Sequence, residues 1–193
     1  MGNFLDILYD VLFHPAVAMR TIASEKRLGY SLGVFLLSVF VPAWASYFGL
    51  QSVDFSVVAW FVIIGQILIS LVFWIVGAGF FGLIAELLGG HGTAAGLLAA
   101  MGFSHFPRIF IAPLLVFASL LPRTVQALFL ALFVSVTVVW TLILYIIAIR
   151  EAYLLSTLRA VMVLITPLAV IFGIGIVIVV SVGTMLLQWL PWL

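Results

Sequence analysis

The residues of this 193-residue sequence that could do chemistry are few, and most of them flank long apolar segments. Carboxylates, imidazoles and guanidinium groups that meet at one end of a helical bundle can hold a ligand or an ion, because a charge beside apolar surroundings is usually paired or faces water. The candidate cluster is Glu25, Glu86, His91, His105, Arg108, Arg150 and Glu151. Within it, Glu86 is a candidate ion-pair partner of Arg108 or Arg150. The alternative interpretation is that these charges only set topology and contact lipid headgroups.

Metal binding and catalysis find little support in these residues. The three histidines, His14, His91 and His105, show neither the H-x-x-x-H nor the E-x-x-H spacing of common metal sites, and the chain contains no cysteine. The glycine-rich run GGHGT (89–93) lacks the Lys-Ser/Thr of a phosphate loop. No catalytic constellation of familiar geometry is evident. We therefore expect no enzymatic activity, no cofactor and no metal site.

The composition indicates whether the chain is surrounded by water or by lipid. Apolar residues make up 67% of the chain and charged residues only 7%, against about 25% charged in a soluble domain. A globule of this size with so few polar side chains could not cover its own surface. We predict an all-α integral membrane protein. The net charge of +1 gives no indication of nucleic acid as a partner.

Five membrane-spanning helices are predicted after a short amphipathic segment. Residues 1–29 form a cytoplasmic or interfacial segment of two amphipathic pieces that break at His14-Pro15, and residues 30–193 form the membrane domain. Pro42 is expected to interrupt the first span. Ala94–Phe103 is expected to be an interfacial or re-entrant half-helix before a short third span. The predicted spans are Tyr30–Leu50, Val57–Ala85, Pro107–Leu121, Thr124–Ile149 and Val161–Leu190, with Trp189 and Trp192 as anchors at the far end.

The distribution of lysine and arginine predicts the orientation. One side of the predicted membrane domain holds all the basic residues except Arg123, which places the N-terminus in the cytoplasm and the C-terminus outside. Arg20, Lys26 and Arg27 on the amphipathic segment are candidates for binding the membrane surface. Small-residue surfaces around Gly77–Gly82 and Ala95–Ala100 favour close helix packing, within one chain or in a homo-oligomer.

Three stretches of the sequence carry a family resemblance: HPAVAMRTIASE (14–25), ELLGGHGTAAGLLAAMGFSHFPRI (86–109) and WTLILYIIAIREAYLLSTLRA (140–160). Together they resemble the Yip-one (Ypt/Rab-interacting protein) family over nearly the whole chain. The resemblance implies five spans and a cytoplasmic N-terminus. Eukaryotic members are associated with Rab GTPases, hetero-oligomerise and carry a sizeable cytosolic N-terminal region. Only about 29 residues precede the first span here, so GTPase binding is doubtful and the chain is more similar to the short bacterial and archaeal members, in a plasma (inner) membrane.

Two functions remain open at this point. The first is a non-enzymatic membrane organiser or adaptor that binds lipids or partner membrane proteins. The second is a transporter, channel or lipid-translocating protein with a polar site at the cytoplasmic side of spans two to four. The resemblance favours the first.

Overall fold

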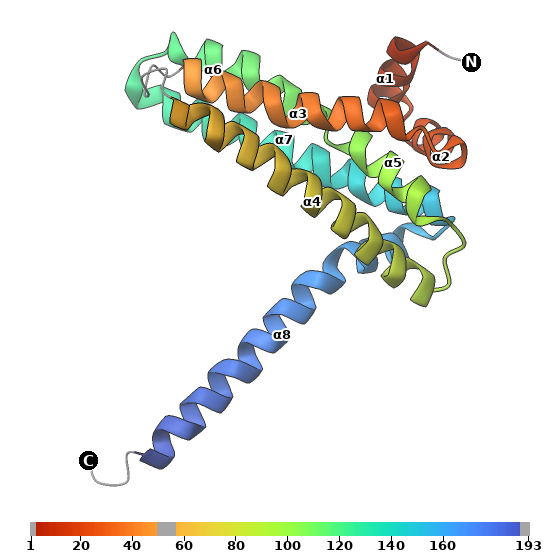
Figure 1. Ribbon diagram of the computed structural model, residues 1–193, viewed down its shortest axis with the longest axis vertical. Helices are drawn as coiled ribbons and strands as arrows, with labels where there is room; N and C mark the ends of the chain where they lie inside the picture. Colours follow the sequence, from red (N-terminus) through yellow and green to blue (C-terminus); the bar gives the residue numbers. More distant parts are fainter. Residues whose placement is uncertain (1–2, 50–56, 190–193) are drawn as a thin grey trace.

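The computed structural model describes residues 3–49 and 57–189, and every element in these ranges is a helix. This confirms the predicted all-α fold (Figure 1). The predicted loop that carries Asp54, and the tryptophan anchors, lie outside the described side chains. In chain order the helices are α1 (Phe4–Phe13), α2 (Pro15–Glu25), α3 (Leu28–Gly49), α4 (Val57–Leu87), α5 (Ala94–Ser104), the 3-10 helix η1 (Phe106–Phe110), α6 (Ile111–Ser119), α7 (Arg123–Tyr153) and α8 (Thr157–Trp189).

Five segments are long and apolar enough to cross a membrane, as predicted. The first is continuous, because α3 runs through Pro42 without a break, so the expected interruption is wrong. Two serines lie four residues before and after Pro42, and each donates its hydroxyl to a backbone carbonyl of α3: Ser38 to that of Phe35, and Ser46 to that of Pro42. The candidate spans are Leu28–Ser46, Ala59–Leu87, Ala94–Ser119, Arg123–Tyr153 and Thr157–Leu186.

The third span is assembled from three pieces. Helix α5 continues through η1 into α6, and together they form one candidate span, Ala94–Ser119. The half-helix and the short span that the sequence suggested as separate segments therefore make one crossing. Pro107 lies at the start of η1, where its missing N–H costs no hydrogen bond. The helix therefore changes to 3-10 geometry at this proline, and the span continues into α6.

The N-terminal helices α1 and α2 form a hairpin that packs on the bundle. The break at His14-Pro15 is confirmed, since α1 ends at Phe13 and Pro15 opens α2. Helix α2 contacts α5 and α7, and its buried face consists of Ala18, Met19, Ile22 and Ala23. The hairpin is therefore bound to protein along this face, whereas the apolar side chains of Leu5, Tyr9, Phe13 and Val17 are exposed.

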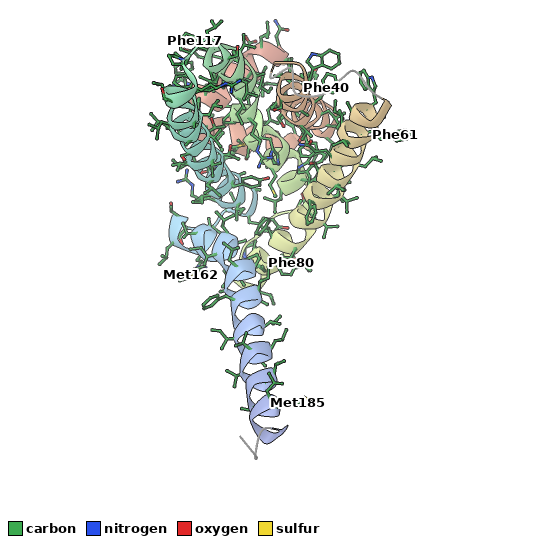
Figure 2. The ribbon with its side chains drawn as sticks, turned by 90° about the vertical axis from the view of Figure 1, so that its left-hand side faces the viewer. Phe40, Phe61, Phe80, Phe117, Met162 and Met185 are labelled. Carbon is green, nitrogen blue, oxygen red and sulfur yellow. The ribbon has the colours of Figure 1, made fainter. Side chains whose placement is uncertain are left out.

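Helix α8 differs from the other spans. Its first turns contact α4 and α7 through buried Ala160 and Val163, and the rest extends away from the bundle (Figure 1). Around Met185 its side chains have no other helix beside them (Figure 2). The core has two clusters: one lies where α3, α4, α5, α7 and the start of α8 meet around the fully buried Leu97 and Tyr153, and the other lies where α1 and α2 pack on α3, α5 and α7.

A glycine turn joins α4 to α5 and brings that end of the bundle together. Gly89 adopts a φ of +83°, which ends α4 in a left-handed conformation. A Cβ on Gly92 would overlap the carbonyl of Ala152, and the backbone N–H of His91 donates to the Tyr153 carbonyl at 2.9 Å. The turn thus lies directly against the end of α7.

Candidate functional site

Several polar residues line a surface pocket at the end of the bundle where α2 and α7 finish and α5 begins. We call this the polar pocket, and the end of the molecule that carries it the pocket end. Its volume is about 230 Å³. The residues that line it are Arg20, Ala23, Ser24, Lys26, His91, Gly92, Thr93, Glu151, Ala152 and Leu154. Four of them, Arg20, Lys26, His91 and Glu151, were candidates from the sequence.

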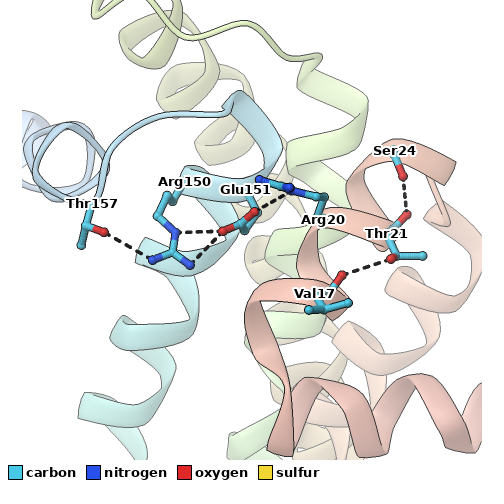
Figure 3. A network of polar contacts seen from close by, with 7 residues as sticks. All are labelled: Val17, Arg20, Thr21, Ser24, Arg150, Glu151 and Thr157. Carbon is cyan, nitrogen blue, oxygen red and sulfur yellow. Dashed lines mark hydrogen bonds and ion pairs between the residues drawn. The ribbon is translucent and has the colours of Figure 1, made fainter.

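Glu151 is held between two arginines in this pocket (Figure 3). One carboxylate oxygen accepts from Arg20 Nε at 2.9 Å, and the other lies 2.8 Å from Arg150 Nη2. Arg150 also donates to the Thr157 hydroxyl, at the first residue of α8. Only 9% of the Glu151 side chain is exposed. A carboxylate this buried needs its charged partners, so the network ties α2, α7 and α8 together.

The pocket keeps an excess of positive charge. Lys26 and His91 are exposed, and neither side chain takes part in an ion pair among the described residues. Thr93 caps α5 by accepting from the Gly96 N–H at 3.1 Å, so the positive end of that helix dipole lies at the pocket wall. Because Arg20 already serves Glu151, Lys26 and His91 are the groups left to bind an anion.

Two further candidates have partners that the sequence did not indicate. Glu86 accepts from the Tyr153 hydroxyl at 3.4 Å, and no ion pair of Glu86 with Arg108 or Arg150 occurs among the described residues. That proposed pairing is wrong, because Arg150 turns to Glu151. Glu25 pairs with Arg27. Arg20 and Arg27 are consequently engaged within the chain, and of the three membrane-surface candidates Lys26 alone keeps a side chain without an ion pair in the described part.

His105 and Arg108 do not lie at the pocket end. The ring of His105 is buried against α3, and its Nε2 lies 2.6 Å from the Tyr145 hydroxyl. Tyr145 precedes the end of α7 by eight residues, which is about 12 Å along the helix. Arg108, three residues further along η1, lies deeper still. The sequence placed both at the start of a short span, whereas they lie inside a longer one.

Sequence reasoning missed the tyrosines and the long-range ion pair. Tyr153 is fully buried and Tyr145 is half-buried, and both bind candidates from the other spans. The predicted fourth span ended at Ile149, so the sequence left Tyr153 in a connecting segment and gave no signal that the two tyrosines belong to one helix. Arg20 and Glu151 are 131 residues apart, and no local pattern joins them.

The described residues contain no group of three or more His, Asp or Glu side chains placed to hold a metal ion. Comparison with known proteins gives one finding: the family model described as the Yip1 domain matches residues 9–180. No curated protein and no solved structure matches the chain.

Proposed function

The chain belongs to the Yip1 domain family, and on that premise we propose that it is a non-enzymatic membrane organiser that binds anionic lipid headgroups at the polar pocket. The observation that carries the proposal is the unbalanced charge of this pocket. Lys26 and His91 face the opening while the single carboxylate, Glu151, is neutralised by Arg20 and Arg150. The absence of catalysis stays a prediction from the sequence.

The distribution of charge supports a cytoplasmic position for the pocket end. Five of the seven basic residues, Arg20, Lys26, Arg27, Arg150 and Arg159, belong to elements that meet there, and Arg123 begins α7 at the other end. With Arg108 inside a span, the bias is five to one. We infer a cytoplasmic N-terminus, an external C-terminus and a plasma membrane of prokaryotic type, where anionic headgroups face the pocket.

The pocket is suited to a headgroup because of its depth in the bilayer. It lies where three candidate spans start or end, at Leu87, Ala94 and Tyr153, which is the level of the lipid headgroups. Helix α2 packs on α5 and α7 through its buried apolar residues, and its exposed residues Arg20 and Ser24 line the pocket. A phosphate bound at Lys26 and His91 would join the hairpin to the α4–α5 turn. Partner membrane proteins are a second class of ligand for the same organising role.

Lys26 is the residue with which to test the pocket. Arg20 and Arg27 are poor choices, because replacing them also breaks pairs with Glu151 and Glu25. Lys26 has a φ of 49°, a conformation that asparagine tolerates well, so Lys26→Asn removes the charge without straining the turn. We expect about a fivefold weaker affinity for dihexanoyl-phosphatidylglycerol by calorimetry, the effect of about 1 kcal/mol for one surface cation.

Arg159→Gln is the matched control, since it removes a cation at the same end that does not line the pocket. It should leave the affinity unchanged. Equal affinities for all three proteins would contradict headgroup binding at the pocket. Flux measurements test the transport alternative separately. We expect that the protein reconstituted in liposomes releases neither trapped chloride nor trapped phosphate. Protein-dependent release of either ion would refute the proposed role.

A further inference from the structure

Helix α1 carries two apolar stripes, and the described part of the chain covers only one of them. Ile7 and Val11 are buried, and residues four apart lie on the same face of a helix. Leu5, Tyr9 and Phe13 have the same spacing, and their exposed fractions are 74%, 56% and 63%. We call these three residues the outer stripe. A contiguous apolar surface of this kind marks a contact with another protein or with a membrane.

A third stripe on α1 is acidic. Asp6 and Asp10 are both exposed and also lie four residues apart, and we call them the acidic stripe. Successive residues are about 100° apart around a helix, so the outer stripe lies opposite Ile7 and the acidic stripe lies between the two apolar ones. Protein therefore covers one side of α1, and its two free sides suit two different media, hydrocarbon and water.

Helix α1 lies at the level where the spans begin. The ring of Phe4 packs on that of Tyr30, the third residue of the candidate span Leu28–Ser46, with centroids 5.5 Å apart. The buried residues of α1 belong to the same cluster as Val34, six residues into that span. At 1.5 Å per residue this places α1 beside about the first 9 Å of the span. Amphipathic helices bury their apolar face to about this depth, 5–10 Å, in a leaflet.

The charge of α1 indicates which property of a membrane it recognises. Insertion of an amphipathic helix depends on its buried apolar area and on the attraction of basic residues to anionic headgroups. Helix α1 contains no lysine or arginine, so only the first contribution is present. A second copy fits the outer stripe less well than lipid does, because two paired α1 helices would bring four aspartates together with no lysine or arginine on either helix.

We propose that α1 inserts the outer stripe among the acyl chains of the leaflet at the pocket end and senses how tightly that leaflet is packed. The acidic stripe then lies in the headgroup layer. Because α2 is tied to α7 by the pair of Arg20 with Glu151, α1 stays beside the spans and adds cross-section to one leaflet only. Such a helix favours a convex, loosely packed leaflet. The outer stripe contributes no residue to the polar pocket, and its insertion needs no anionic lipid.

Spin labels on single introduced cysteines test the insertion, because the chain has no cysteine of its own. Tyr9→Cys and Asp10→Cys are a matched pair of neighbours on the two stripes. The full chain is reconstituted in phosphatidylcholine, and each label is relaxed by oxygen, which concentrates in hydrocarbon, or by a water-soluble nickel chelate. We expect the oxygen-to-nickel accessibility ratio to be about threefold higher for Tyr9→Cys than for Asp10→Cys, with or without added phosphatidylglycerol.

Three results would overturn the inference. Equal ratios for the two labels would mean that both stripes lie in the same medium. Exclusion of both reagents from the Tyr9→Cys label would mean that protein covers the outer stripe, and dipolar broadening between labels would identify that protein as a second copy. A ratio that rises only when phosphatidylglycerol is added would show that lipid charge, and not lipid packing, governs the insertion.

Tyr9→Ser tests the sensing of packing without a label on the stripe. The full chain carries an N-terminal fluorophore that external dithionite bleaches, so the bleached fraction reports molecules whose pocket end faces the convex outer leaflet. We expect this fraction to rise as the liposome diameter falls, and Tyr9→Ser to lose about half of the rise. Asp10→Asn on the acidic stripe and Lys26→Asn in the polar pocket should keep it. No rise for the wild type, or an equal rise for Tyr9→Ser, would overturn the inference and leave headgroup binding at the pocket standing.

Discussion

Helices α5 and α8 are both apolar, yet their surroundings are opposite. Half of the most hydrophobic window of the span that contains α5 is buried inside the protein, against 6% for α8. The difference follows from side-chain size. Helix α5 reads AAGLLAAMGFS, whereas α8 is rich in valine and isoleucine. Small residues let backbones approach closely, which is the main source of helix packing where lipid is as apolar as the helix surface. Hydrophobicity therefore places a helix in the membrane, and residue size decides whether it lies in the core.

The glycines of the two helices express this difference most directly. A Cβ on Gly96 would lie 2.6 Å from the carbonyl oxygen of Ala23 in α2, and one on Gly102 would meet α3 and α4. In α8, a Cβ on Gly173, Gly175 or Gly183 would meet nothing within 4 Å. The same substitution in the two helices is thus a direct test of the comparison.

The largest effect is expected for Gly102→Ala. The added methyl would lie 2.9 Å from Cζ2 of Trp74 and 3.0 Å from the Ser31 carbonyl oxygen, and it would overlap the Ser31 hydroxyl, so α5 must move away from α3 and α4. Overpacking of this kind costs about 1–3 kcal/mol of unfolding free energy. Unfolding in mixed micelles with rising SDS, followed by circular dichroism, measures the loss. A Gly102→Ala protein as stable as wild type would mean that α5 is not the packed core.

The long apolar spans were predictable because their signal is local. The ends of α4, α7 and α8 were predicted to within about four residues, from the apolar runs and the charges that bound them. The third span was divided incorrectly, since Ser104, His105, Pro107 and Arg108 together are typical of a boundary. The structure accommodates them by burying Ser104 and His105 and by tightening the chain into η1. Burial by other helices is a tertiary effect, which the local pattern does not contain.

The sequence predicted which residues belong to the candidate site, but it did not predict which of them form ion pairs and hydrogen bonds with one another. Arg20, Lys26, His91 and Glu151 were all singled out, because rare charges beside apolar segments collect where spans end. Their partners depend on the α1–α2 hairpin folding back on α5 and α7. That contact pairs Arg20 with Glu151, and Glu86 accepts a hydrogen bond from Tyr153. No spacing within one helix encodes such a contact.

An intermediate effect is expected for Glu151→Gln, which removes the ion pair between Arg20 of α2 and Glu151 of α7. The change leaves Arg150 and Arg20 without their carboxylate. Since Arg20 is 66% exposed and its pair is screened by water, the expected loss of stability is about 1–2 kcal/mol. Protease cleavage of the α1–α2 hairpin should also accelerate.

Glu25→Gln is the control for this prediction. Glu25 is half exposed and pairs with Arg27 two residues away, so its loss breaks no contact between distant elements. We expect unchanged stability and unchanged cleavage for this variant. Equal behaviour of the two variants would show that the Arg20–Glu151 pair does not hold the hairpin on the bundle.

The smallest effect is expected for Gly175→Ala in α8, where the comparison predicts almost no cost. The added methyl meets open space, and alanine favours the helix by up to about 1 kcal/mol in water. In a membrane the unfolded reference keeps its helices, so we expect a gain between zero and about 0.5 kcal/mol. The same SDS titration measures it. A loss above 1 kcal/mol that depends on protein concentration would contradict this, because it would mean that another chain packs on α8 at Gly175, and the exposed face of α8 would then be an interface and not a lipid-facing surface.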